Sequence, residues 1–84
     1  MTEVFVIAGR WDETVDYGTS IALANSYPLH QLLVADDNHL FAKLNASGLR
    51  LHLLRTFLKY GLNSPQLNEA LQACEPYRWK EPGV

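Results

Sequence analysis

Two aspartates and a histidine in the middle of the chain are the residues best suited to chemistry. Asp36 and Asp37 are followed, after one residue, by His39. Carboxylates beside an imidazole can form an acid–base pair or bind a metal ion. Zinc sites, however, use three or four matched ligands, and Asx side chains at residues 36–38 are typical of a turn. We expect a turn, with no catalytic residue, metal ligand or cofactor, and keep an enzyme or metal-binding protein that uses these three residues as an alternative.

The single cysteine is a poor candidate for a nucleophile. Cys74 falls on the apolar stripe of a predicted helix with Leu67 and Leu71, and no catalytic partner lies near it in the sequence. One cysteine cannot form an internal disulfide, which is typical of a reduced compartment. We therefore expect no enzymatic activity and a cytoplasmic location.

A basic stripe is the first candidate for a binding surface. His52, Arg55 and Lys59 share one face of a helix predicted over residues 49–60. This face could contact an acidic partner or a nucleic-acid backbone. It could equally be a solvated face whose cations complement the dipole at the end of the helix.

Tryptophan stands beside arginine near each end of the chain. Arg10 precedes Trp11 in a predicted turn, and Arg78 precedes Trp79. Both residue types often carry the binding energy of an interface, although the two tryptophans could instead fold back over a small core. The expected partner-binding residues are Arg10, Trp11, His52, Arg55, Lys59, Arg78 and Trp79.

Residues 49–75 predict two helices joined by a tight turn. Gly61 can end the first helix in the left-handed conformation, while Ser64 and Pro65 supply an N-cap and a first helical residue for the second. Pro76 stops the second helix. A connection this short implies neighbouring, roughly antiparallel helices.

The N-terminal half predicts strands. Residues 4–8 are a continuous β-branched and aromatic run, typical of a strand, and residues 14–24 alternate in polarity as a half-buried strand does. Together they suggest an antiparallel hairpin. A helix over residues 19–25 is the alternative for the end of this stretch.

Residues 29–46 fit two structures. One is a β-hairpin with strands over 31–35 and 39–44, and the other is a helix that follows Pro28. The poor helix formers at residues 36–38 favour the hairpin.

These elements predict an α+β fold in which a small antiparallel sheet of two to four strands is covered by the C-terminal helical hairpin. We expect one domain over residues 1–76 and an irregular C-terminal tail over 77–84. The predicted core consists of Val4, Val6, Val15, Tyr17, Ile21, Leu23, Leu33, Leu40, Leu53, Leu54, Phe57, Leu58, Leu67, Leu71 and Cys74.

Composition narrows the class of function. The net charge of −2 argues against non-specific binding to nucleic acid, and no apolar run reaches the length of a membrane-spanning helix. A short chain without a catalytic motif is typical of accessory proteins of bacteria and phages. We expect a non-enzymatic protein-binding module, an adaptor or inhibitor of a larger protein, with self-association through a sheet edge as a further option. A nucleic-acid-binding domain that uses helix 49–60 is the alternative.

Overall fold

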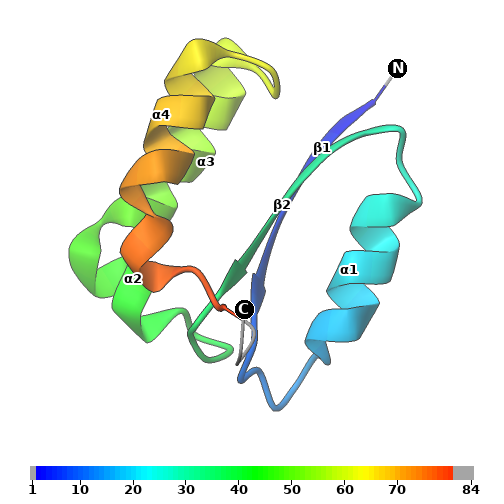
Figure 1. Cartoon of the computed structure of the whole chain (residues 1–84), viewed down its shortest axis with the longest axis vertical. Helices are drawn as coiled ribbons and strands as arrows, with labels where there is room; N and C mark the ends of the chain where they lie inside the picture. The colour runs from blue at the N-terminus through cyan, green and yellow to red at the C-terminus, as the bar shows by residue number, and fades with distance from the viewer. Residues whose placement is uncertain (1, 81–84) are drawn as a thin grey trace.

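The computed structural model describes residues 2–80 and shows a two-stranded sheet between two helical layers (Figure 1). β1 (Glu3–Gly9) and β2 (Leu29–Ala35) run parallel, and α1 (Tyr17–Asn25) connects them across one face. On the other face lie α2 (Ala42–Ser47), α3 (Leu49–Tyr60), α4 (Pro65–Ala73) and the short 3₁₀ helix η1 (Glu75–Tyr77).

The fold is α+β, but the prediction of an antiparallel sheet is wrong. Residues 17–25 form α1, because the Asp16 carboxylate accepts a hydrogen bond from the Gly18 N–H at 3.0 Å and caps a helix there. A helix between two strands returns the second strand parallel to the first, whereas a tight turn would have made it antiparallel. The alternative of a helix over residues 19–25 is confirmed, and this helix begins at Tyr17.

The hairpin predicted over residues 29–46 is half correct. Its first strand lies within β2, but residues 39–44 contain a turn and the start of α2. Asp37 is buried and accepts hydrogen bonds from the backbone N–H groups of Lys43 at 3.1 Å and Leu44 at 3.0 Å. These amides belong to the first turn of α2 and would otherwise lack partners. A residue predicted to make a β-turn therefore helps to start a helix.

The predicted helical hairpin is confirmed as α3 and α4. The Ser64 hydroxyl accepts a hydrogen bond from the Leu67 N–H at 3.1 Å, with Pro65 at the first helical position. Gly61 ends α3 with a φ of +88°, a region that favours glycine. The helix α4 ends at Ala73, before the Pro76 that was expected to stop it.

The main core lies between the sheet and the helices α2, α3 and α4. Phe5 and Leu33 point from the strands to this side, and the Phe5 ring meets the Phe57 ring of α3 edge-on at 5.7 Å between centroids. Alternation along the strands directs Val6 and Leu32, which lie opposite each other, to the α1 side. The buried residues of the core are Leu33, Ala35, Leu44, Leu53, Leu67, Ala70 and Cys74.

Several residues of the predicted core are exposed instead. Leu58 is 82% exposed, Leu40 73% and Leu23 53%, while Leu54 and Val15 are also exposed. Leu40 lies in the loop before α2 rather than in a strand, and the others lie on helix faces or loops that point away from the sheet.

The segment after α4 returns to the sheet. Arg78 forms an antiparallel bridge with Ala35, and the Trp79 N–H donates to the Val34 carbonyl at 2.9 Å. Part of the predicted irregular tail therefore covers the carboxyl end of the outer edge of β2. Residues 81–84 of that tail lie outside the described residues.

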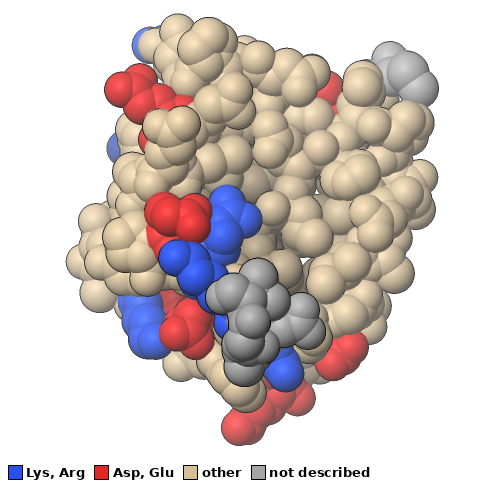
Figure 2. Space-filling view, in the orientation of Figure 1, with Lys and Arg blue, Asp and Glu red and all other residues tan. Residues whose placement is uncertain are grey.

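Charged side chains gather around this returning segment in the lower half of Figure 2. They are paired with one another: Arg78 lies 3.1 Å and Lys80 3.6 Å from Glu75, and Lys43 lies 3.6 Å from Asp36. Most of the charges in this region are therefore neutralised by ion pairs within the chain.

Candidate protein-binding site

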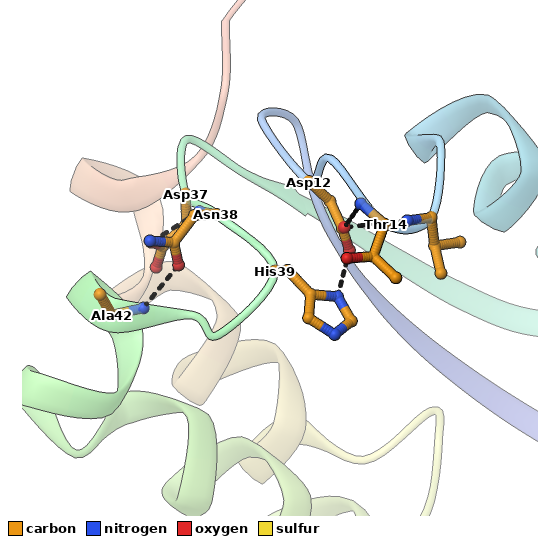
Figure 3. A network of polar contacts seen from close by, with 7 residues as sticks. Asp12, Thr14, Asp37, Asn38, His39 and Ala42 are labelled. Atoms are coloured by element: carbon orange, nitrogen blue, oxygen red, sulfur yellow. Dashed lines mark hydrogen bonds and ion pairs between the residues drawn. The ribbon is translucent and has the colours of Figure 1, made fainter.

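The three residues considered for catalysis or metal binding, Asp36, Asp37 and His39, do not form one site (Figure 3). The Nδ1 atom of His39 lies 2.9 Å from an oxygen of Asp12, rather than beside the aspartates that precede it in the sequence. Asp36 accepts a hydrogen bond from the Trp11 indole at 2.7 Å, and Asp37 is occupied by amides of α2. Within residues 2–80 no group of three or more His, Cys, Asp or Glu side chains could hold a metal ion.

The two loops that carry these residues meet at the carboxyl ends of β1 and β2, where ligand sites of parallel sheets usually lie. Gly9 permits the close approach, because a Cβ atom there would lie 2.7 Å from the Asn38 carbonyl oxygen. A hollow of about 280 Å³ opens beside His39 and Trp11. Its walls come from turns, and the side-chain contacts of His39 with Asp12 and of Asn38 with the Ala42 N–H hold these turns in place.

Asp12 is one such turn residue. Its carboxylate accepts hydrogen bonds from the backbone N–H groups of Thr14 at 2.8 Å and Val15 at 2.9 Å. The Val15 amide is the largest cause that lowers the pKa of Asp12, followed by the hydrogen bond with His39; partial desolvation acts in the opposite direction. The Asp12–His39 pair thus joins the loop after β1 to the loop after β2.

The structure brings the predicted site residues Arg10, Trp11 and Trp79 together: both tryptophan rings lie against the Arg10 guanidinium. The Cζ atom of Arg10 lies 4.5 Å from the Trp11 ring centroid, 5.0 Å from that of Trp79 and 4.4 Å from that of Tyr17. Tyr17 was not among the predicted site residues, since the sequence pattern placed it in a strand. Arg78 lies beside Trp79 but pairs with Glu75. These residues contact one another, and Trp11 is the member that remains widely exposed, at 55%.

The other predicted site residues, His52, Arg55 and Lys59, are exposed on α3, on the opposite side of the sheet from α1. In the part of the chain that the structure describes, Arg55 and Lys59 have no ion-pair partner. The Lys59 ammonium lies 5.2 Å from the Tyr60 ring centroid, but no carboxylate in the described residues neutralises either cation, in contrast to the paired charges around η1.

Three leucines that the sequence prediction did not assign to a site lie beside this basic stripe. Leu51 is 52% exposed, Leu54 36% and Leu58 82%, and their spacing of i, i+3 and i+7 makes them one stripe. At about 100° per residue this stripe points away from the buried Leu53, and the basic residues follow next around the helix. We call the set Leu51, Leu54, Arg55, Leu58 and Lys59 the leucine–basic face.

A signal for this face exists in the sequence. Leucines occur on both sides of α3: Leu49 and Leu53 face the core, whereas Leu51 and Leu58 face away from it. A helix with two apolar sides is typical of one that is covered on both sides. The sequence prediction placed Leu54 and Leu58 in the core together with Leu53 and gave no role to Leu51.

Comparisons of the chain with protein-family models, curated proteins and solved structures gave no match. No helix in residues 2–80 has the length and apolar character needed to cross a membrane.

Proposed function

We propose that this protein is a non-enzymatic protein-binding module whose partner docks on the leucine–basic face. The observation that carries this proposal is the exposure of Leu58, which is 82% accessible and shares a stripe with two other exposed leucines. Contiguous apolar patches on a soluble domain commonly mark interaction sites.

The chemistry of the face defines the kind of partner. Leucines at i, i+3 and i+7 offer ridges against which a second helix packs. Arg55 and Lys59 border these ridges and have no acidic partner in residues 2–80. The complementary partner is an amphipathic helix with apolar residues on one side and carboxylates along one border.

Two alternatives have less support. A nucleic-acid backbone would gain from the cations but would leave Leu51 and Leu58 uncovered, and the net charge of −2 opposes it. An enzyme that uses the central aspartates would need carboxylates free to react, whereas Asp37 is buried beneath the amides of α2.

A pair of synthetic helical peptides tests the proposal. Both carry leucines at i, i+3 and i+7; one has glutamates along the border and the other has lysines. We expect the glutamate peptide to shift the NMR amide signals of residues 51–59, and Leu58→Glu to abolish the shift. The matched control Leu23→Glu, at an exposed leucine of α1, should bind normally.

Three results would contradict the proposal. They are no shift with either peptide, equal shifts with both peptides, and equal loss of binding in the Leu23→Glu control. A salt-sensitive gel shift with duplex DNA that Arg55→Glu removes would favour the nucleic-acid alternative instead.

A further inference from the structure

The outer edge of β1 is free within residues 2–80, because β1 pairs with β2 alone. The Arg10 N–H donates to the Ala35 carbonyl at 2.9 Å, so the backbone N–H of Arg10 points toward β2. Since backbone groups alternate along a strand, those of Val6 point to β2 and those of Phe5 and Ile7 point outward.

A hollow of about 510 Å³ lies beside the carboxyl half of this edge, at residues 7–9. Its lining includes Ser20 of α1 and Arg50 of α3. In the described chain it includes no residue of β2, but residues 39–41 of the loop after β2 border it. The helices α1 and α3 cover opposite faces of the sheet (Figure 1). The hollow therefore lies beyond the carboxyl half of β1, between α1 and α3, where one end of a further strand would lie.

The strand β1 itself lacks the usual protection against strand pairing, although Arg50, which stacks on the Phe41 ring at 4.8 Å, and Asp12 line the hollow beside it. Natural proteins block exposed edges with charges, prolines, bulges or a covering segment. Residues 4–8 contain neither a charge nor a proline, and the pairing of β1 with β2 runs without a bulge from Glu3 to Gly9. The edge of β2, by contrast, is covered near its end by the bridge from Arg78.

We propose that a second copy of this chain pairs with β1 in antiparallel orientation, about a two-fold axis at Val6. The outward backbone groups of Phe5 and Ile7 are placed symmetrically on either side of Val6. The axis therefore sets Phe5 opposite Ile7 of the second copy, and Ile7 opposite Phe5 of the second copy. Each pair then exchanges both of its N–H···O bonds.

The side chains suit this pairing as well as the backbone does. Residues opposite each other in an antiparallel pair point to the same face, so Phe5 would extend the core beside Ile7 of the second copy. Val6 would meet Val6 of the second copy on the α1 side. The matching apolar sequence on both sides of Val6 favours a second copy over a foreign strand, and the exposed Val15, which also lines the hollow, would be covered.

Two arginine variants on α1 test the proposal. Ser20→Arg adds a second long cation to the hollow, which Arg50 already lines, while Thr19→Arg places the same charge on an exposed neighbour that does not line it. Light scattering on a dilution series should give a dimer for the wild type and Thr19→Arg and a monomer for Ser20→Arg. Circular dichroism checks that all three chains are folded.

Amide hydrogen exchange supplies a second measurement on the wild type. The Phe5 and Ile7 amides should exchange slowly at concentrations where the dimer forms and rapidly after dilution. A monomeric wild type at every concentration would overturn the proposal. So would a dimer that survives Ser20→Arg while the Phe5 and Ile7 amides exchange rapidly.

Failure here is separable from failure of the proposed function. Arg55→Glu should weaken binding of the glutamate peptide and leave the mass of the dimer unchanged. A dimer that Arg55→Glu dissolves and Ser20→Arg preserves would place self-association on α3 and refute pairing through β1.

Discussion

The Arg10 guanidinium carbon lies 5.0 Å from the centre of the Trp79 ring, so the residue after β1 is joined to the segment after η1. The Trp79 backbone is held in turn by the Val34 carbonyl of β2. Tyr17, at the start of α1, packs against the same ring at 5.9 Å between centroids. One cation and its aromatic neighbours therefore connect β1, α1 and the C-terminal segment.

We expect Arg10→Ala and Trp79→Ala each to lower the free energy of unfolding by about 1–3 kcal/mol, because each removes a cation–π contact together with packing. Urea denaturation of the two single variants and the double variant measures their coupling, which should be about 0.5–2 kcal/mol. Arg55→Ala, at an exposed arginine, is the control and should change little. A coupling energy near zero would show that the contact does not stabilise the fold.

Two leucines of α3 should respond in opposite ways to truncation. Leu53 is fully buried, so Leu53→Ala should cost about 2–5 kcal/mol of stability through loss of burial and a residual cavity. Leu58 is 82% exposed, so Leu58→Ala should stay within about 0.5 kcal/mol of the wild type. Denaturant midpoints at equal m-values measure both changes. Equal losses would mean that Leu58 belongs to the core.

Removing the Asp37 carboxylate should destabilise the start of α2. It accepts hydrogen bonds from three backbone amides, those of Asn38, Lys43 and Leu44. Asp37→Ala leaves these donors without their partner, at a cost of about 1–3 kcal/mol. Thermal or urea unfolding checks the value against Glu13→Ala, an exposed acidic residue. Identical stability of the two variants would disprove the role of Asp37.

Lowering the pH should destabilise the fold, in part because Asp12 becomes protonated. The Val15 amide, with help from His39 and against some desolvation, holds the pKa of Asp12 below its ordinary value. A carboxyl whose pKa is lower in the folded state stabilises the fold above its unfolded pKa, and this contribution is lost as the pH falls through the folded pKa. Below about pH 4 the stability of the wild type should therefore fall more steeply than that of Asp12→Asn. Urea unfolding over a pH series compares the slopes, and parallel curves would refute the prediction.

The elements with local signals could be predicted from the sequence. Ser64 and Pro65 start α4 through a hydroxyl and a ring that act within one turn, and the apolar run at residues 4–8 forms β1. For α1 the preferred prediction of a strand was wrong, because its residues also alternate in polarity and few of them are buried: within α1, Ala24 is the buried one. Its helical state depends on the Asp16 cap and on packing against the sheet.

The arrangement of the site could not be predicted, because it depends on contacts between residues that are far apart in the sequence. The Arg10 cluster forms because the chain returns to the sheet at Trp79, far along the sequence. Likewise, the spacing of Leu51 and Leu58 fits a buried or an exposed stripe equally well. Which one it is depends on the position of the sheet, and that depends on the parallel pairing of β1 with β2.

The bridge between Arg78 and Ala35 has a consequence for the growth of assemblies. A molecule with one available sheet edge can pair once, and the assembly then closes at two copies. A molecule with two available edges can add copies without limit and form a fibre. By covering the carboxyl end of the β2 edge, the segment around Arg78 would leave less of that edge open to a further copy and so favour closure of the assembly at two copies.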